Sequence, residues 1–278
     1  MRSHARKTLY FQGDASALGG FIERPFEKVI PSQASVSLPP AGGYATARSE
    51  SFNHEQIISC RSAYSRVSGS GDGEDAPWSA LVTSVVEGLN ILEVVTAERV
   101  VAQISVDYPG HGGYRRISLA GSHFEGLRIA GFNAFPMMNW GLLRPKPGAS
   151  ASQSQLTFPI FEQTGREQAD KLIKGIEGED KEPFRWIAER FEWMTTKRGP
   201  EDDKCVLCSL VDGVDQAIPG RSFGHVVEIP DFGRIFLGEV LVSPTSIQLS
   251  MIRAELGCSI KAQTTAGSGS VGGHLVPP

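Results

Sequence analysis

Short stretches of apolar or alternating residues recur along the chain and are separated by turn-forming residues. Val, Ile, Ser and Thr dominate these stretches, and β-branched side chains favour strands. The breaks, such as 68–77 and 108–113, are rich in Gly, Pro and Asp, which is typical of turns between antiparallel strands. We predict strands at 55–68, 79–90, 98–107, 115–120, 121–130, 205–211, 224–229, 234–242 and 246–256, and one more at 259–265.

One region departs from this pattern and predicts a helical hairpin inserted at about 164–198. Thr164 and Glu167 have the spacing of a capping box, in which a hydroxyl and a carboxylate satisfy the free amides of a helix start. A second helix is expected to begin near 180–183 and to end at 199–200. The apolar face of this second helix consists of Phe184, Ile187, Phe191 and Met194. We expect the helices to cover an open end or edge of the sheet, and the alternative is a lid over a ligand.

The domain organisation follows from composition along the 278 residues. Residues 9–13 (Leu-Tyr-Phe-Gln-Gly) resemble the end of a tobacco etch virus protease site, so we interpret 1–13 as the remnant of an expression tag. Pro, Ser and Gly dominate 14–43, which predicts an extended N-terminal arm, and 266–278 is expected to be a flexible tail. Residues 44–265 should form one domain: a mainly β, antiparallel barrel or sandwich of about 8–10 strands with the helical hairpin inserted.

Charge and hydropathy narrow the class of partner. The net charge of −4 provides no basic field of the kind that nucleic acid requires. No uninterrupted apolar run approaches the ~18 residues of a membrane-spanning helix, so we expect no membrane span. We expect a soluble, cytoplasmic protein, with the reservation that the tag can have replaced a native signal peptide. A homo-oligomer is compatible with the sequence.

The common catalytic and metal-binding motifs are absent from the sequence. Cys205 and Cys208 form a single Cys-x-x-Cys, without the second pair or the histidines that a structural zinc site needs. We therefore expect no metal and no cofactor.

Strand alternation places an acidic residue among apolar neighbours in three predicted strands. Residues two apart share a face, so Glu87, Glu125 and Glu239 each fall on an apolar face. Burial would raise the pKa of such carboxyl groups toward the range useful for general acid or base work. His123 lies on the same face as Glu125 and could share a proton with it. Glu87, His123, Glu125 and Glu239 are the candidate catalytic residues.

Two alternatives remain open for these acids. Arginines in the predicted strands could neutralise them and fill a polar part of the interior; the strand arginines are Arg99, Arg128, Arg234 and Arg253. A one-residue bulge would also exchange the two faces and send the acids to solvent.

Aromatic and Met side chains gather at 132–140, just after a predicted strand. This segment is either a hydrophobic plug, which we favour, or one wall of a ligand pocket. Candidate ligand-binding residues are Phe135, Met137 and Trp140 of this segment, Trp186 of the second helix, and His225 at a strand start.

The function we expect is binding of a small apolar or amphipathic molecule in a barrel-like cavity. The acids would allow cofactor-independent proton transfer, as in an isomerase, a cyclase or a lyase. The alternative is a non-catalytic structural or protein-interaction protein. The first predicts a closed cavity with unpaired acids, and the second predicts a filled core with each buried Glu paired to Arg.

Overall fold

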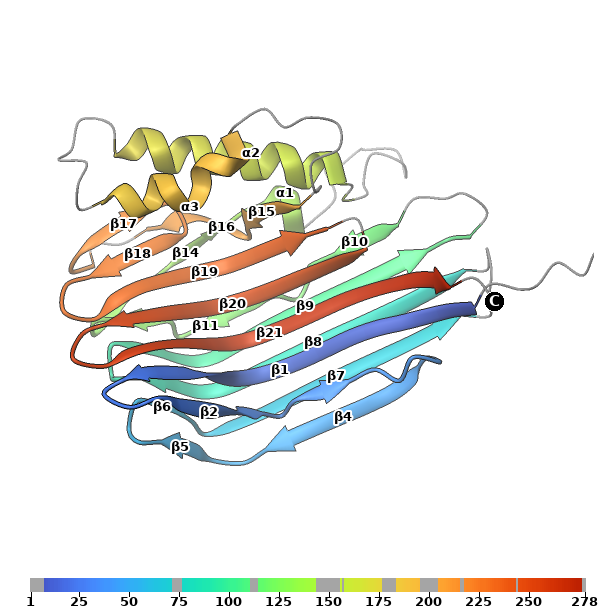
Figure 1. Ribbon diagram of the computed structural model, residues 1–278, viewed down its shortest axis with the longest axis horizontal. Helices are drawn as coiled ribbons and strands as arrows, with labels where there is room; N and C mark the ends of the chain where they lie inside the picture. Colours follow the sequence, from blue (N-terminus) through green and yellow to red (C-terminus); the bar gives the residue numbers. More distant parts are fainter. Residues whose placement is uncertain are drawn as a thin grey trace, which may run out of the picture.

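The computed structural model describes residues 8–71, 77–110, 115–143, 156, 158–176, 184–195, 205–215, 218–243 and 245–276 (Figure 1). Within them the chain is mainly β, with two large antiparallel sheets and a small two-stranded one. The predicted class, mainly antiparallel β with a few helices, is confirmed.

Sheet A contains the two ends of the described chain. Its strands are β1 (Thr8–Arg24), β2 (Lys28–Gln33), β3 (Val36–Ser37), β15 (Val206–Ser209), β17 (Arg221–Phe223), β18 (Val226–Ile229), β19 (Gly233–Val242), β20 (Ser246–Gly257) and β21 (Lys261–Val276). The strand order is β17-β18-β19-β20-β21-β1-β2, with β15 beside β19 and β3 beside β1.

Sheet B is formed by the segment between β3 and the helices. Its strands are β4 (Gly43–Ser49), β5 (Phe52–His54), β6 (Ile58–Cys60), β7 (Ser62–Gly71), β8 (Trp78–Ile91), β9 (Val95–Tyr108), β10 (Arg116–Ser118), β11 (His123–Glu125), β12 (Arg128–Ile129) and β13 (Phe132–Asn133). The strand β8 lies between β7 and β9, β4 lies outside β7, and β10, β11 and β12 pair with β9. The small sheet pairs β14 (Pro136–Met138) with β16 (Val211–Val214).

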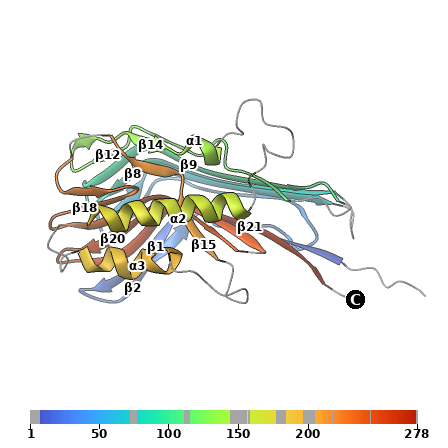
Figure 2. The ribbon, with the colours of Figure 1, turned by 90° about the horizontal axis from the view of Figure 1, so that it is seen from above.

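The two large sheets lie face to face (Figures 1 and 2). Their inner faces pack into one continuous hydrophobic cluster, to which Ile22, Val82, Ile104 and Leu249 contribute fully buried side chains. Neither sheet closes on itself among the described strands, so the barrel expected from the sequence is not formed. Apolar side chains from both layers occupy the space in which the ligand cavity was expected.

The terminal segments differ from the sequence-based expectation. The expected arm, 14–43, contains most of β1 together with β2 and β3 of sheet A, the expected tail is part of β21 as far as residue 276, and 9–13 are part of β1. The strands β1 and β21 pair along almost their full length, from Thr8 opposite Val276 to Arg24 opposite Lys261. The small residues that suggested flexibility allow the sheets to approach closely. A Cβ added to Gly269 would lie 2.6 Å from Val82 Cγ1 in sheet B.

Three helices are described: α1 (Trp140–Leu143), α2 (Phe158–Gly175) and α3 (Arg185–Thr195). The capping-box prediction is wrong, because α2 begins at Phe158, with Pro159 in its first turn, and Thr164 lies inside the helix. The predicted apolar face of α3 is confirmed, since Phe184 just before the helix and Ile187, Phe191 and Met194 within it are buried. The expected boundaries at 180–183 and 199–200 lie outside the described residues. The helices α2 and α3 pack together over the β15–β19 side of sheet A (Figure 2).

Glycines in left-handed backbone conformation reverse the side-chain alternation midway along both sheets. In β8, Val82 and Val86 face the core before Gly88, whereas Leu89 and Ile91 face it afterwards. Gly88 has a φ of +61°, a conformation that costs glycine little. The other glycines at such reversals are Gly126, Gly238 and Gly267, with φ values of +59°, +63° and +63°. Because neighbouring strands reverse at the same level, the register is kept while the faces exchange.

Candidate functional site

Three of the candidate catalytic residues lie on the outer face of sheet B. Glu87 and Glu125 are the cross-strand partners of Arg99 on either side of β9. Ser62 Oγ donates a hydrogen bond of 2.8 Å to Glu87. His123 Nε2 lies 2.9 Å from Glu125 Oε1, and both side chains are nearly half exposed. These groups form a polar, solvent-facing row around an arginine.

The structure does not bring the three carboxyl groups together. Glu239 lies on the outer face of sheet A, on the far side of the molecule from Glu87 and Glu125. The reason is the reversal of alternation at Gly88, Gly126 and Gly238, each next to one of the acids. Sequence alternation therefore assigned each acid to the same face as apolar residues beyond a neighbouring glycine. Those apolar residues face the core, whereas the acid does not.

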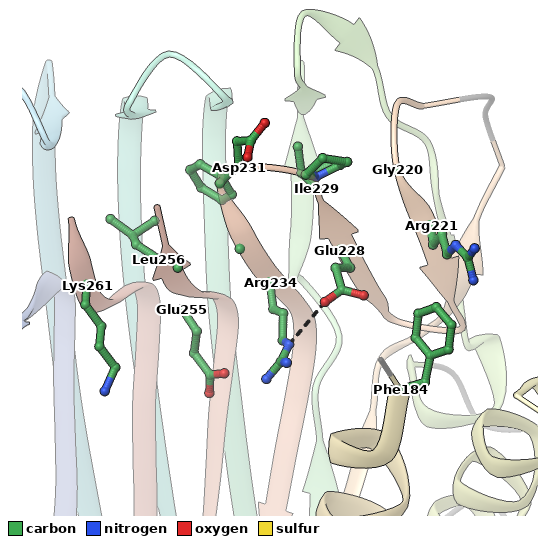
Figure 3. Close-up of a pocket in the computed structure, with 14 residues that line it drawn as sticks. Phe184, Gly220, Arg221, Glu228, Ile229, Asp231, Arg234, Glu255, Leu256 and Lys261 are labelled. Carbon is green, nitrogen blue, oxygen red and sulfur yellow. Dashed lines mark ion pairs between the residues drawn. The ribbon is translucent and has the colours of Figure 1, made fainter. Parts of the chain in front are cut away.

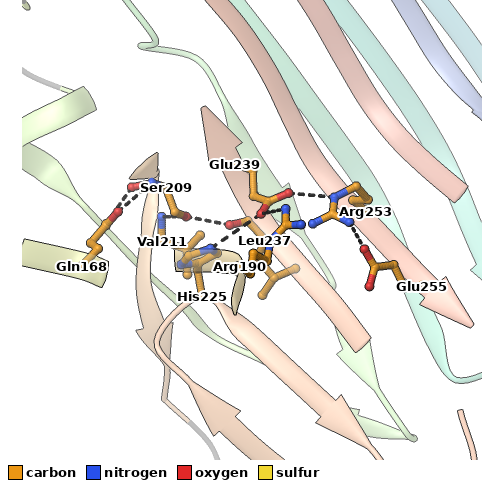
Figure 4. Close-up of polar contacts among 9 residues, drawn as sticks. All are labelled: Gln168, Arg190, Ser209, Val211, His225, Leu237, Glu239, Arg253 and Glu255. Atoms are coloured by element: carbon orange, nitrogen blue, oxygen red, sulfur yellow. Dashed lines mark hydrogen bonds and ion pairs between the residues drawn. The ribbon is translucent and has the colours of Figure 1, made fainter. Parts of the chain in front are cut away.

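Glu239 is nevertheless buried, and Figure 4 shows its carboxyl group in contact with Arg190 and Arg253. Arg190 of α3 donates a 2.9 Å hydrogen bond to Oε1, and Arg253 Nε of β20 donates one of 2.8 Å to Oε2. The Glu239 side chain is only 7% exposed and that of Arg253 10% exposed. Arg253 also pairs with Glu255. One carboxylate thus joins a helix and two strands, and we call these four residues the buried charge cluster.

Two candidate ligand-binding residues lie beside the buried charge cluster. His225 is buried, with Nε2 3.9 Å from Glu239 Oε1, and its ring meets Phe191 edge-on. Trp186 of α3 packs edge-on against Phe236. His225 directly precedes β18, near the strand start expected from the sequence, and it lies beneath α3.

The electrostatics of Glu239 favour its ionised form. Burial would raise its pKa, but the polar contact with His225 and the hydrogen bond and charge of Arg253 outweigh burial, and Arg190 adds to them. The pKa of Glu239 is therefore held well below its ordinary value. A carboxylate with two arginine partners accepts a proton poorly. The geometry thus gives Glu239 a structural role in joining α3 to the sheet.

The helix α2 is attached by a neighbouring polar network (Figure 4). Gln168 accepts a 2.7 Å hydrogen bond from Ser209 N and donates one of 2.9 Å to Ser209 O. Ser209 Oγ donates to Leu237 O at 2.7 Å. These bonds satisfy buried polar groups where a helix meets the β15–β16 connection.

Sequence reasoning missed Arg190 and Gln168, although a signal existed for Arg190. It lies on the apolar stripe of α3, three residues after Ile187 and four before Met194. A charged residue on a buried stripe needs a partner of opposite charge. Which strand supplies that partner depends on how the helix docks.

The remaining ligand-binding candidates form an exposed apolar segment. Phe135 is 58% exposed, Met137 49% and Trp140 60%. They occupy β14 and the residues beside it, where Asp215 N donates to Phe135 O and fixes the backbone. These side chains therefore form neither the plug expected from the sequence nor the wall of an apolar interior.

A groove of about 810 Å³ lies at the hairpin ends of sheet A, next to the start of α3 (Figure 3). Opposite charges alternate across its strands, because Arg221 faces Glu228 and Glu228 faces Arg234. Phe184 forms one side, with Arg221 4.5 Å above its ring. The groove is amphipathic, with paired charges beside an aromatic ring.

The described part of the chain contains no candidate metal-binding site. No group of three or more His, Cys, Asp or Glu side chains is placed there to hold an ion. The four cysteines are free, and burial raises the pKa of the Cys60 and Cys208 thiols. Among the described helices, none is long and apolar enough to cross a bilayer.

Comparison with known proteins assigns the chain to a family. No curated protein and no solved structure matches it. The family model described as "Domain of unknown function (DUF8256)" matches residues 9–243, which is most of the chain and includes residues 9–13. The chain therefore belongs to the DUF8256 family.

Proposed function

We propose that this chain is a non-catalytic interaction protein that binds another protein chain at an open edge of sheet B. The observation that carries the proposal is the strand β4. It pairs only with β7 among the described strands, and Figure 1 places it at the lower margin of the molecule. An open edge presents unpaired backbone N–H and C=O groups, to which a strand of a partner can add.

The arrangement of charges supports a non-catalytic role. The buried candidate acid, Glu239, is paired with two arginines, and the other two carboxyl groups lie in a solvent-facing row. The inner faces of the two layers are filled with apolar side chains. These features match those expected of a structural or interaction protein.

The composition of β4 distinguishes it from the other sheet edges. With seven residues, Gly43–Ser49, it is longer than the other edge strands in the described part of the chain. The edge strand β2 carries Lys28 and Pro31, two residue types that oppose strand addition. The strand β4 contains neither Pro, Lys nor an acidic residue. Sheet A is thus protected at its β2 edge, while sheet B offers β4.

Hydrogen exchange in dilute protein tests whether the edge is open. Alternate amides of β4 face β7 and the outside, so we expect about half of the amides in 43–49 to exchange quickly. The central strand β8 is the internal control and should remain protected throughout. Full protection of 43–49 in monomeric protein would show that the chain itself covers the edge and would contradict the proposal.

A second candidate function is small-molecule binding in the groove of Figure 3. Its volume of about 810 Å³ supports this, as does Phe184 beside the arginines. The amphipathic anion 8-anilinonaphthalene-1-sulfonate is a suitable probe, and its fluorescence should rise saturably on binding. Arg234→Ala should abolish the rise, whereas Arg61→Ala, at an exposed arginine between β6 and β7, should leave it unchanged. Equal binding by both variants would argue against the groove.

A further inference from the structure

The sequence of β4 is suited to pairing with itself in antiparallel orientation. The sequence of β4 is Gly-Tyr-Ala-Thr-Ala-Arg-Ser, with Thr46 at its centre. Ala45 and Ala47 are each one residue from Thr46, and Tyr44 and Arg48 are each two residues from it. Building on the open edge proposed above, we propose that the partner is a second copy of this chain. The two β4 strands pair antiparallel with Thr46 on the two-fold axis, which joins the two B sheets into one.

The exposed side chains of β4 complement one another in this register. Tyr44, Thr46 and Arg48 lie on the exposed face of β4. Each Tyr44 lies opposite Arg48 of the second copy, and Thr46 lies opposite Thr46, both favourable cross-strand pairs. Tyr44 already holds a guanidinium within its own chain, since Arg66 lies 5.0 Å from the ring centroid. A tyrosine–arginine contact therefore suits this position on the sheet.

The other face of β4 also permits close pairing. Ala45 and Ala47 are half-buried and small, so they place neither bulk nor charge between the strands. In this register the two Arg48 side chains lie at opposite ends of the paired segment. A shift that placed Arg48 opposite Arg48 would bring like charges together and is disfavoured. Shape and charge thus select the register centred on Thr46.

Disulfide trapping tests the register directly. Only the residue on the axis faces its own copy, so Thr46→Cys should give a disulfide-linked dimer. Directly opposite Cα atoms lie about 4.5–5.5 Å apart, within the range that a disulfide spans. The matched control is Tyr44→Cys on the same face, whose copies would lie about 13 Å apart. Both variants are made in a Cys205→Ser, Cys258→Ser background, because these two thiols are half-exposed.

Sedimentation velocity measures the association without any cross-link. The wild-type chain should shift from monomer to dimer as its concentration rises, and Thr46→Pro should abolish the shift. Near-UV circular dichroism checks that this variant, at an exposed position, keeps the fold of the wild type. A mixture of Tyr44→Cys and Arg48→Cys proteins should form mixed disulfide dimers.

Each opposite result has its own meaning. A chain that stays monomeric at all concentrations, while amides in 43–49 exchange quickly, overturns self-association and leaves the open edge for another partner. Protection of all these amides in protein that sediments as a monomer overturns both proposals. Cross-linking of Tyr44→Cys alone as readily as Thr46→Cys overturns the register.

Discussion

Glu239→Gln is expected to lower the free energy of unfolding at neutral pH by about 3–5 kcal/mol, the typical cost of removing one partner from a buried ion pair. Arg253 would keep its charge in a side chain that is only 10% exposed, without the carboxylate that receives its Nε hydrogen bond. Arg190 would lose its ion pair with the sheet and keep only its contact with the Phe236 ring, so α3 should loosen first. Urea unfolding followed by Trp fluorescence reports this, because Trp186 lies on α3.

The pH dependence of stability follows from the lowered pKa of Glu239. In the unfolded chain the carboxyl group titrates near its ordinary value of 4.5, and in the folded chain it stays ionised to lower pH. Its contribution is therefore fully present above about pH 4.5 and is lost as the pH falls toward the folded-state pKa. The difference in stability between wild type and Glu239→Gln should shrink over the same interval.

Two further variants separate the buried pair from ordinary surface charge. Glu125→Gln removes a carboxylate from a contact with His123 in which both side chains are nearly half exposed, and should cost no more than about 1 kcal/mol. Glu239→Gln combined with Arg253→Met removes both charges and should recover part of the loss. If Glu239→Gln were as mild as Glu125→Gln, the buried charge cluster would not hold α3 to the sheet.

Much of the fold could be predicted from local patterns, because each central strand carries its own signal. Valines mark 79–107 as strand. The turn-forming residues after 107 and after 229 mark the ends of the strands that precede them. The strand β1 was missed and only the start of β21 was predicted, at 259–265, since small residues dominate much of both strands. Gly269 leaves room for Val82 of the opposite sheet. This requirement for a residue without a side chain arises only when the two sheets pack together.

The sequence identified some residues of the candidate site but not how they are arranged. Glu239 and His225 were selected from the sequence and do meet in the structure, 3.9 Å apart. Arg190 completes the buried charge cluster from a helix that is distant in sequence, and helix docking is a tertiary event that strand patterns do not encode. The face assignments failed because alternation was extended across Gly88, Gly126 and Gly238. An isolated glycine within a strand pattern is itself a sign of such an irregularity.

The reversal of alternation at Gly267 of β21 leads to a prediction about stability. Its φ of +63° is a conformation that costs other residues about 1–2 kcal/mol. A Cβ there would also lie 3.1 Å from Val100 Cγ1 of sheet B, and overpacking of this kind costs about 1–3 kcal/mol. Gly267→Ala should therefore lower the free energy of unfolding by about 2–5 kcal/mol, measured by urea denaturation.

A double-mutant cycle separates the two causes at Gly267. Val100→Ala removes the methyl group that the new Cβ would meet, so adding it to Gly267→Ala should cost less than Val100→Ala alone costs. The backbone strain would remain in the double variant. Gly175→Ala is the control, because nothing lies within 4 Å of its added Cβ and its backbone is helical, so stability should stay unchanged or rise by up to about 1 kcal/mol. If Gly267→Ala proved equally harmless, the left-handed glycine could not be what reverses the faces of β21.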